Sequence, residues 1–437
     1  MSQVLRIGIA GLGTVGSALL HLLEDHGEEI AEKAGCSLSV TAVSARNRNV
    51  DRGVDVSGYI WFDDPVRLAE SDDIDVLVEL IGGDEGPARI CVEAALSRGK
   101  SVVTANKALL AKHGASLAKL AEENGAGLSY EAAVAGAIPI IKTLREALSG
   151  NRVSRIFGIM NGTCNYILTR MEAEKISFAD CLADAQRLGY AEADPTFDIG
   201  GHDTAHKLAI LTSLCFGTEI SFDSIYLEGI DKITLADIEA ADQLGYRIKL
   251  LGVAQQTETG IEQRVHPAMV PKTAAIAGID GVTNAVAIEA DKAGNLMLSG
   301  PGAGGAATAS AVAGDLADLA RGERPPVFGR PADSLQPYVR AGMRLHEGGY
   351  YLALEIADKP GVLARIATHM AEAEISLQSV VQHREIEQEN GKPLRAQPVI
   401  IITHETTESA VRAALERIEA DDSVLGAPKM IRIEKLG

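Results

Sequence analysis

The first forty residues place a glycine-rich turn between an expected strand and an expected helix. Residues 4–10 form a short apolar run typical of a buried strand, and residues 14–34 have a helical pattern. The turn between them carries Gly11, Gly13 and Gly16, in the spacing Gly-x-Gly-x-x-Gly. The first glycine of such a turn allows the tight bend, the second lets a pyrophosphate approach the backbone, and the third lets the helix pack on the strand. The chain is therefore predicted to begin with a Rossmann dinucleotide-binding domain.

Alternating strands and helices extend this prediction over residues 1–135. Further strands are expected at residues 37–45, 75–82, 101–106 and 128–134, and helices at residues 87–98 and 108–124. Because strands that alternate with helices pair in parallel, we expect an α/β fold whose sheet is covered by helices on both faces. An alanine-rich helix at 302–321, which follows a glycine-rich turn, is expected to return to this domain.

The pattern changes from residue 136 to 300, where helices precede what look like antiparallel strands. Strands are expected at residues 153–162, 249–256, 263–270 and 284–290, and helices at residues 164–174, 177–188, 203–216 and 235–242. This order predicts a central α+β domain with helices on one side of a mixed sheet. A proline-rich linker is expected at 322–349, and residues 350–437 follow the order βαββαβ, which predicts a small ferredoxin-like domain.

Composition excludes several classes of protein. A chain of 437 residues is too long for one typical hydrophobic core, so more than one domain is expected. Its 41 basic and 60 acidic residues give a net charge of −19, which argues against a nucleic-acid partner. No run of 18 apolar residues exists, so no membrane span and no signal peptide are expected. Five scattered cysteines fit free thiols in a reducing compartment, so the cytoplasm is the expected location.

Residues 189–208 hold the densest group of charged side chains. The group comprises Glu192, Asp194, Asp198, Asp203 and Lys207. Asp203 and Lys207 are four residues apart and share one face of a helix, so carboxylates there could hold the ammonium of a small amino acid while the lysine gives a proton. Lys107 competes for that role, because it follows a strand of the parallel sheet, where loops face ligand. The alternative for Asp203 and Lys207 is an exposed ion pair of little energetic weight.

Two other motifs offer different chemistry. Cys164 could act as the nucleophile of an acylating aldehyde dehydrogenase, although a small buried helix residue is the more common fate of such a cysteine. His202 and His206 have the spacing of a zinc-binding helix. A metalloprotease has no use for a dinucleotide loop, so we disfavour zinc.

The end of the second expected strand bears on the choice of cofactor. An NAD site usually has a carboxylate there, whereas this chain has Arg46 and Arg48 and no carboxylate before Asp51. Because an arginine can pair with a 2′-phosphate, we expect NADP, with NAD as the alternative. The other interpretation of these arginines is that they are solvated loop charges.

Several segments together resemble the homoserine dehydrogenase family. They are residues 11–16, 104–107, 131–141, 161–168, 189–211 and 300–304, in the family's order. The resemblance covers residues 1 to about 321 and implies NAD(P)H-dependent interconversion of L-aspartate 4-semialdehyde and L-homoserine, a step towards threonine, methionine and isoleucine. It also implies a dimer formed through the central domain.

The resemblance implies roles for single residues. The implied substrate residues are Gly189, Glu192 and Asp203, with Asp198 in support, and the implied proton donor is Lys207, with Lys107 as its competitor. The implied cofactor residues are Gly11, Gly13, Thr14, Val15, Gly16, Lys107 and Gly304, beside Arg46 from the argument above. A sodium site is implied at Glu131 with the backbone carbonyls of Val134, Gly136 and Ile138, and one carboxylate with carbonyls is indeed a donor set for a hard cation. The alternative is a helix-entry turn without an ion.

The C-terminal region resembles an ACT domain, through its βαββαβ order and residues 358–363 (DKPGVL). Such domains commonly pair and bind an amino acid at their interface, which here implies feedback by L-threonine and a homodimer or homotetramer. A dimerisation module without a ligand is the alternative. Two rival hypotheses remain for the whole chain: an acylating semialdehyde dehydrogenase that uses Cys164, and a non-catalytic amino-acid sensor.

Overall fold

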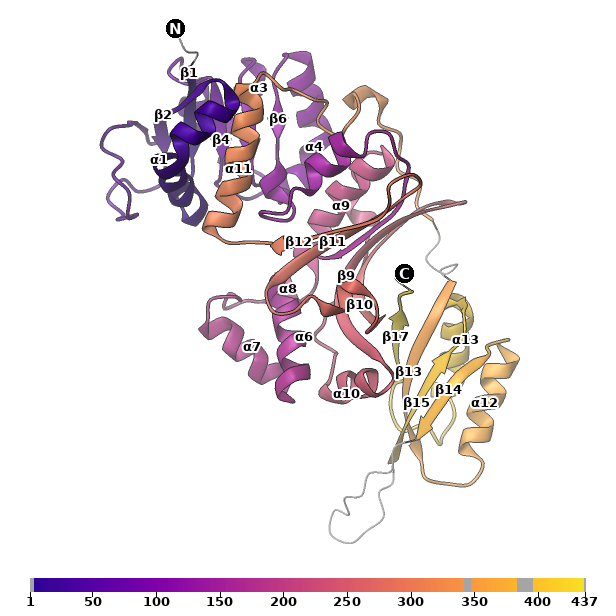
Figure 1. Ribbon diagram of the computed structural model, residues 1–437. Coiled ribbons are helices and arrows are strands. Elements are labelled where there is room, and N and C mark those ends of the chain that lie inside the picture. Colours follow the sequence, from indigo (N-terminus) through magenta and orange to yellow (C-terminus); the bar gives the residue numbers. More distant parts are fainter. Residues whose placement is uncertain (1–3, 342–346, 383–395, 436–437) are drawn as a thin grey trace.

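The computed structural model describes residues 4–341, 347–382 and 396–435 (Figure 1). Residues 342–346, at the end of the expected linker, lie outside the described residues. Within the described part, no helix is both long enough and apolar enough to cross a membrane. The chain forms two sheets, one of six strands near the N-terminus and one of eleven strands that continues to the C-terminal region.

The N-terminal sheet has the order β3-β2-β1-β4-β5-β6, and every pairing in it is parallel. Its strands are β1 (Val4–Ala10), β2 (Ser37–Ser44), β3 (Ile60–Phe62), β4 (Val76–Glu79), β5 (Ser101–Thr104) and β6 (Leu128–Ser129). Its helices are α1 (Thr14–Ala34), α2 (Pro65–Glu70), α3 (Pro87–Ser97) and α4 (Lys107–Glu123). Helix α11 (Gly305–Ala320) comes from far along the chain and packs beside α1 (Figure 1), where Ala309 and Leu316 are buried against β1. The parallel α/β fold is confirmed.

One expected strand was wrong in length. The sequence predicted a strand over 128–134, but β6 ends at Ser129 and a short 3-10 helix, Glu131–Ala133, follows. The chain leaves the sheet there because the buried Glu131 carboxylate accepts hydrogen bonds from the backbone amides of Ile141 and Lys142, which need acceptors at the start of the next helix. Ala132, Ala133 and Val134 are buried in this turn and not in the sheet.

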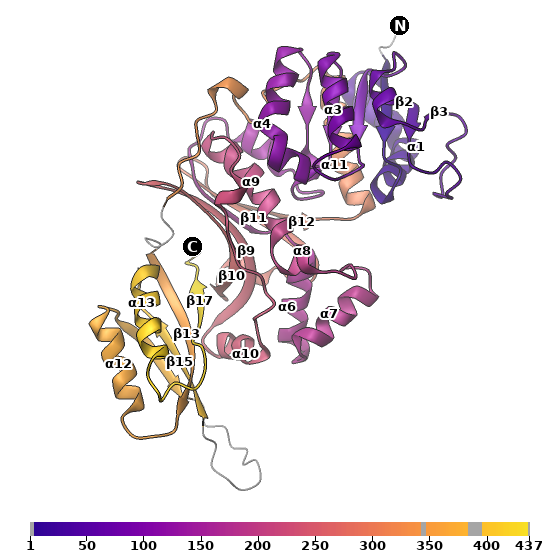
Figure 2. The same cartoon turned by 180° about the vertical axis from the view of Figure 1, so that it is seen from behind.

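The central region places helices on one face of an antiparallel sheet (Figure 2). Its strands are β7 (Val153–Ile159), β9 (Tyr246–Thr257), β10 (Gly260–Pro271), β11 (Thr283–Ala290) and β12 (Gly294–Pro301), the last of which we had not predicted, and a short β8 (Tyr226–Leu227) pairs with β10. Its helices are α6 (Gly162–Glu174), α7 (Phe178–Arg187), α8 (Thr196–Ile199), α9 (His202–Phe216) and α10 (Leu235–Gln243). Helix α9 packs on β9 and β10, and it reaches the N-terminal region through contact with α4.

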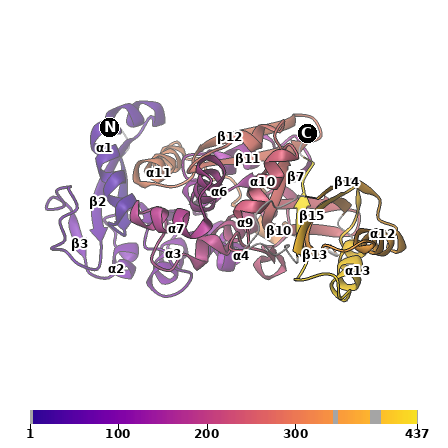
Figure 3. The same ribbon diagram turned by 90° about the horizontal axis from the view of Figure 1, so that it is seen from below.

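The C-terminal region has the expected βαββαβ order. It comprises β13 (Glu347–Ala357), α12 (Val362–Glu372), β14 (Leu377–Gln382), β15 (Ala396–Thr403), α13 (Glu408–Glu419) and β17 (Lys429–Ile433), with a short β16 (Thr406–Thr407) beside β13. Strand β17 pairs antiparallel with β13 and parallel with β10 of the central region. The central and C-terminal strands therefore belong to one eleven-stranded sheet. Figure 3 shows the N-terminal region and the C-terminal region at opposite ends of the molecule.

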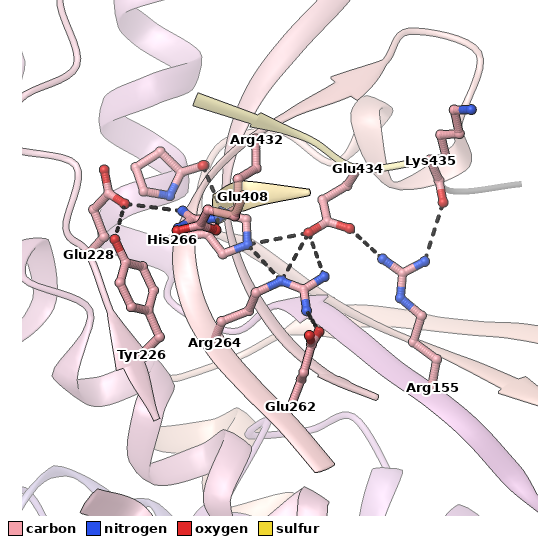
Figure 4. Close-up of polar contacts among 11 residues, drawn as sticks. Arg155, Tyr226, Glu228, Glu262, Arg264, His266, Glu408, Arg432, Glu434 and Lys435 are labelled. Carbon is pink, nitrogen blue, oxygen red and sulfur yellow. Dashed lines mark hydrogen bonds and ion pairs between the residues drawn. The ribbon is translucent and has the colours of Figure 1, made fainter. Parts of the chain in front are cut away.

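A buried network of ion pairs fixes this junction (Figure 4). The carboxylate of Glu434, next to β17, binds Arg264 of β10 at 2.9 Å and Arg155 of β7 at 2.5 Å. Arg432 of β17 makes two hydrogen bonds of 2.9 Å to Glu408 of α13. All five side chains are largely buried, and removing one partner of such a network typically costs ~3–5 kcal/mol. The C-terminal region is thus attached by charge pairing as well as by strand pairing.

Candidate active site

A cleft of about 540 Å³ opens between the N-terminal domain and the central region. Val15 from the glycine-rich turn, Lys107 from the start of α4 and Gly304 before α11 line one side of it. Asp203 and Lys207, both on α9, line the other side. Asp198, Asp203 and Lys207 of the charged cluster therefore face the expected dinucleotide site, whereas Glu192 and Asp194 are exposed and do not line the cleft.

The glycine-rich turn has the geometry that the motif predicts. Gly11 has φ +107°, and a Cβ atom added there would lie 2.5 Å from the carbonyl oxygen of Leu80. A Cβ atom on Gly16 would lie 2.1 Å from the carbonyl oxygen of Gly11, so helix α1 packs tightly on the turn. Nothing lies within 4 Å of a Cβ atom added at Gly13, which leaves room for a pyrophosphate beside the first turn of α1. Thr14, at the start of α1, follows directly.

A second cavity, of about 390 Å³, extends the cofactor site past the turn. It is lined by Gly11 and Gly13 and also by Arg46 and Arg52. Arg52, which the sequence reasoning missed, is held by the carbonyl oxygens of Leu12 at 3.1 Å and of Asn47 at 2.5 Å. The cavity lies at the end of β2, where the adenosine half of a dinucleotide binds in this fold.

Asp203 lies at the centre of the charged cluster. Its carboxylate binds the Nζ atom of Lys207 at 2.7 Å and the Nζ atom of Lys107 at 3.2 Å. The side-chain amide of Asn161 donates to the same carboxylate at 2.9 Å. Since Asp203 and Lys207 are only 6% and 7% exposed, the exposed ion pair that we had considered is excluded.

The electrostatics of the two aspartates differ. Burial alone would raise the pKa of Asp203, but the ammonium groups of Lys207 and Lys107 hold that pKa well below its ordinary value. Burial and the nearby Asp203 charge instead raise the pKa of Asp198, although Asn161 and Thr163 donate hydrogen bonds to it. Asp203 is therefore an anion held between two lysines in the cleft.

Local structure places these side chains. Gly201, with φ +86°, precedes α9 and packs against Val265 and Leu227, so the helix starts in a fixed position. One turn into α9, Lys207 donates to the backbone carbonyl of Met160 at 2.6 Å, at the end of β7. Asn161 follows directly and caps α6 by accepting from the amide of Cys164. The sequence reasoning missed Asn161 as a site residue, although its place between a strand and a helix was a usable signal.

Of the remaining predicted substrate residues, some line the cleft and one does not. Gly189 and Asp198 line the cleft, together with Thr163, whose hydroxyl group donates to the carbonyl of Tyr190. Glu192 is exposed and is not among the residues that line the cleft.

The predicted sodium ligands surround a turn beside the cleft. Both oxygens of the Glu131 carboxylate accept backbone amides, at 2.7 Å and 2.9 Å, and burial raises its pKa to about 7. Val134 lines the cleft, Gly136 has φ +57°, and the carbonyl of Ile138 accepts a hydrogen bond from Ile140. The turn is thus closed by protein groups, whereas its donor set of one carboxylate and three carbonyls also suits a hard cation.

The rival chemistries receive little support. Cys164 is completely buried, and burial raises its pKa well above the ordinary value, so a thiolate nucleophile is disfavoured. His202 and His206 pack against the aromatic rings of Phe197 and Phe222. Among the described residues, no three histidine, cysteine, aspartate or glutamate side chains come together as a metal site.

Comparison with known proteins agrees with this geometry. Residues 11–131 match the family model of the NAD-binding domain of homoserine dehydrogenase, and residues 139–317 match that of homoserine dehydrogenase itself. Residues 350–420 match the ACT domain. Fold and site thus define an NAD(P)-dependent oxidoreductase that acts on a CH–OH group and carries a C-terminal ACT domain.

Individual relatives cover most or all of the chain. A homoserine dehydrogenase of Pseudomonas aeruginosa is 44% identical over 99% of both chains. A solved homoserine dehydrogenase of Thiobacillus denitrificans is 43% identical, with a TM-score of 0.93 over 100% of this chain and 99% of that one. A hyperthermophilic archaeal homoserine dehydrogenase solved with NADPH is 28% identical, with a TM-score of 0.63 over 72% of this chain and 97% of that one. The chain belongs to the homoserine dehydrogenase family, as the sequence predicted.

Proposed function

We propose that this chain reduces L-aspartate 4-semialdehyde to L-homoserine, and catalyses the reverse reaction, in the biosynthesis of threonine, methionine and isoleucine. The observation that carries the proposal is the buried Asp203 with Lys107 and Lys207, facing the glycine-rich turn across one cleft. Family membership supports the same reaction.

In this proposal Val15, Lys107 and Gly304 would hold a nicotinamide at the cleft, where that group would supply or accept a hydride. The developing alkoxide needs a proton, and the ammonium groups of Lys207 and Lys107 are the donors within reach. Asp203 keeps both ammonium groups directed into the cleft and contributes a negative charge for the amino group of the substrate. Asp198 and Gly189 shape the substrate end, while the exposed Glu192 can take part only if its loop closes over the substrate.

The roles of the two lysines can be separated by substitution. We expect Lys207→Ala to lower kcat for homoserine oxidation ~10²-fold or more, the usual effect of losing a general acid–base group. We expect Lys107→Ala to raise KM as well, since Lys107 begins α4 in the dinucleotide-binding domain. The measurement is initial-rate kinetics, with circular dichroism as a check of folding and exposed Lys112→Ala as the control. A near-normal kcat for Lys207→Ala would mean that Lys107 or water, and not Lys207, is the proton donor.

We propose NADP as the preferred cofactor. Arg46 lines the cavity at the end of β2, and the same cavity holds no carboxylate from β2 itself. The archaeal relative solved with NADPH supports a site of this kind in the family.

Charge reversal tests the cofactor preference. Arg46→Asp should raise KM for NADPH about tenfold or more, because a charge-assisted hydrogen bond is worth ~1.5–3 kcal/mol, and should leave KM for NADH nearly unchanged. Arg48→Asp is the comparison, because Arg48 lies 5.6 Å from the ring centre of Trp61 and is not among the residues lining the cavity. An unchanged ratio of the two KM values in Arg46→Asp would contradict the proposed contact.

We propose that Glu131 and the carbonyls of Val134, Gly136 and Ile138 can hold a sodium ion. Support comes from the donor set and from the buried carboxylate, which lies beside Lys142 and Asp315. Without an ion the raised pKa of Glu131 means that ionisation opposes folding, so stability falls as pH rises from about 4.5 to about 7. A cation bound to the ionised carboxylate would offset this loss.

Sodium binding should therefore depend on pH. At pH 6 a proton must leave before the ion binds, which costs ~1.4 kcal/mol for each unit below the pKa. We expect sodium chloride to raise Tm more than potassium chloride of equal concentration at pH 8, and much less at pH 6. Lys142 and Asp315 titrate alike in both salts, so the difference in Tm between the two salts reports the binding of sodium alone. Equal Tm values in both salts at pH 8 would contradict the proposed sodium site.

We propose a homodimer formed through the outer face of the central sheet. An apolar groove of about 200 Å³ lies there, lined by Phe157, Ile276, Ala287, Leu296 and Met297. Met297 on the end strand β12 is 39% exposed. Exposed apolar surface on an edge strand is typical of a subunit interface.

Sedimentation can separate a dimer from a tetramer. Met297→Glu should convert the assembly towards monomers, because a charge at the centre of an apolar interface is poorly solvated. Val380→Glu, at the exposed edge strand β14, should affect only a further association through the ACT domains. An unchanged sedimentation coefficient for Met297→Glu would place the interface elsewhere.

We propose, finally, that an amino acid, with L-threonine as the first candidate, regulates the enzyme through the ACT domain. The match of residues 350–420 to that domain supports regulation of this kind.

A further inference from the structure

Asn284, on β11, is a buried polar residue in the wall of the active-site cleft. It is only 1% exposed, and it lines the cleft beside Val282 and Gly302. Its Oδ1 atom has no hydrogen-bond partner. Of the buried side-chain polar atoms that lack such a partner in the described part of the chain, only this one belongs to a residue that lines the cleft. An unpaired amide oxygen in such a place destabilises the fold unless a ligand supplies a donor.

The alternation of side chains along β11 favours an apolar residue at this position. Residues two apart on a strand point to the same face of the sheet. Val286 and Ile288 follow Asn284 on its face, and both are completely buried in the hydrophobic core. Asn284 therefore interrupts an apolar row with a polar group, and the fold alone gives no reason for an amide there.

A glycine makes room for the Asn284 amide. A Cβ atom on Gly302 would overlap the Nδ2 atom of Asn284. Gly302 is not among the glycines with positive φ, so the close approach of the amide, and not the backbone conformation, requires glycine at that position. The amide is thus placed directly against the segment 301–304, which leads into α11.

Asn165, on α6, is an asparagine of equal burial with a structural role. It is also 1% exposed, and its amide nitrogen donates to three backbone carbonyls between residues 279 and 283, at 3.0–3.3 Å. Its Oδ1 atom accepts a hydrogen bond of 3.1 Å from the Nζ atom of Lys249. Asn165 therefore holds the segment that precedes Asn284, and its oxygen is paired within the protein, unlike that of Asn284.

The position of Asn284 is next to the dinucleotide side of the cleft. A Cβ atom on Gly305 would lie 3.0 Å from the backbone oxygen of Thr14, so the segment after Gly302 touches the glycine-rich turn. Val15 of that turn and Ala105, which directly follows β5, line the same cleft. In a parallel α/β sheet of this kind, the ligand binds at the carboxyl ends of the strands.

The chemistry of Oδ1 selects among the groups that can enter the cleft. A carboxylate has no hydrogen to donate, and a substrate ammonium has the charged oxygens of Asp198 and Asp203 available in the same cleft. The carboxamide of a nicotinamide is neutral and carries an NH₂ group, which is the kind of donor that Oδ1 lacks. Because the terminal torsion of asparagine is broad, a small rotation turns Oδ1 towards such a donor.

We propose that the side chain of Asn284 accepts a hydrogen bond from the carboxamide NH₂ group of the nicotinamide and thereby orients the ring in the cleft. The inference rests on the cofactor site of the proposed function and adds a residue that positions the cofactor within it. A ring held at its carboxamide cannot turn about its bond to the ribose, so one face stays directed at the substrate groups.

Isothermal titration calorimetry on the full-length protein tests the contact. The ligands are NADP⁺ and NAD⁺, each paired with its 3-acetylpyridine analogue, in which a methyl group replaces the NH₂ of the carboxamide. We expect Asn284→Leu to raise Kd for the two nicotinamide cofactors about tenfold, because a buried donor is left unpaired, and to leave Kd for both analogues unchanged. Asn124→Leu, at the exposed end of α4, is the control and should change neither value.

Thermal unfolding without cofactor separates this positioning role from a structural one. Asn284→Leu should keep Tm at or above the wild-type value, since its Oδ1 atom has no protein partner to lose. Asn165→Leu should lower Tm by several degrees, since it removes the hydrogen bonds that hold residues 279–283. Asn284→Ala provides a second variant that cannot be too large for the space beside Gly302.

Steady-state kinetics should show a lower kcat for homoserine oxidation in Asn284→Leu and an unchanged KM for homoserine. An equal rise in Kd for cofactors and analogues, an unchanged Kd for the cofactors, or a loss of Tm as large as that of Asn165→Leu would each overturn the proposal. A rise in KM for homoserine with an unchanged cofactor Kd would assign the amide to the substrate instead. Because binding is measured without homoserine, failure of homoserine oxidation would refute the proposed function and leave the binding test decisive.

Discussion

The buried carboxylate of Asp203 is the interaction on which the active site depends. It binds ammonium groups from two separate parts of the chain, Lys107 at the start of α4 and Lys207 on α9. A buried anion with two cations and an amide donor is stable only if all of them are present, since one unpaired charge in that place costs several kcal/mol. The pairing therefore holds the N-terminal and central regions in the relative position that brings the glycine-rich turn opposite the substrate groups.

The same physical principle operates at the other end of the molecule. Glu434 joins two arginines of the central sheet, and Arg432 joins Glu408 to Glu228. These pairs surround β17, the strand that joins the central strands to the C-terminal strands within one sheet. An ACT domain attached in this way is continuous with the sheet that carries α9.

Sequence patterns predicted elements well where one local signal dominated. The expected helix at 14–34 corresponds to α1, and the expected strand at 4–10 corresponds to β1, because apolar periodicity and the glycine turn fix both ends. The strand predicted at residues 128–134 was wrong in length, because the same buried residues fit either a strand or a buried turn. The hydrogen bonds from the amides of Ile141 and Lys142 to Glu131 favour the turn. Asn161 was missed because its role depends on hydrogen bonds from its amide to two aspartates that lie 37 and 42 residues away in the chain. Arg52 was missed for a similar reason: its role comes from carbonyls that folding brings to it.

The sequence by itself determined the class of fold, the dinucleotide turn, the family and the residue types of the charged cluster, because each of these is written in local spacing and composition. Only the tertiary structure decided that Asp203 and Lys207 are buried, that Lys107 joins them, that Glu192 stays outside the cleft, and that the last strand fuses two sheets into one. These facts depend on contacts between residues that are distant in the chain. Charged side chains become buried and paired only when folding brings those residues into contact, and a local sequence pattern does not predict such contacts.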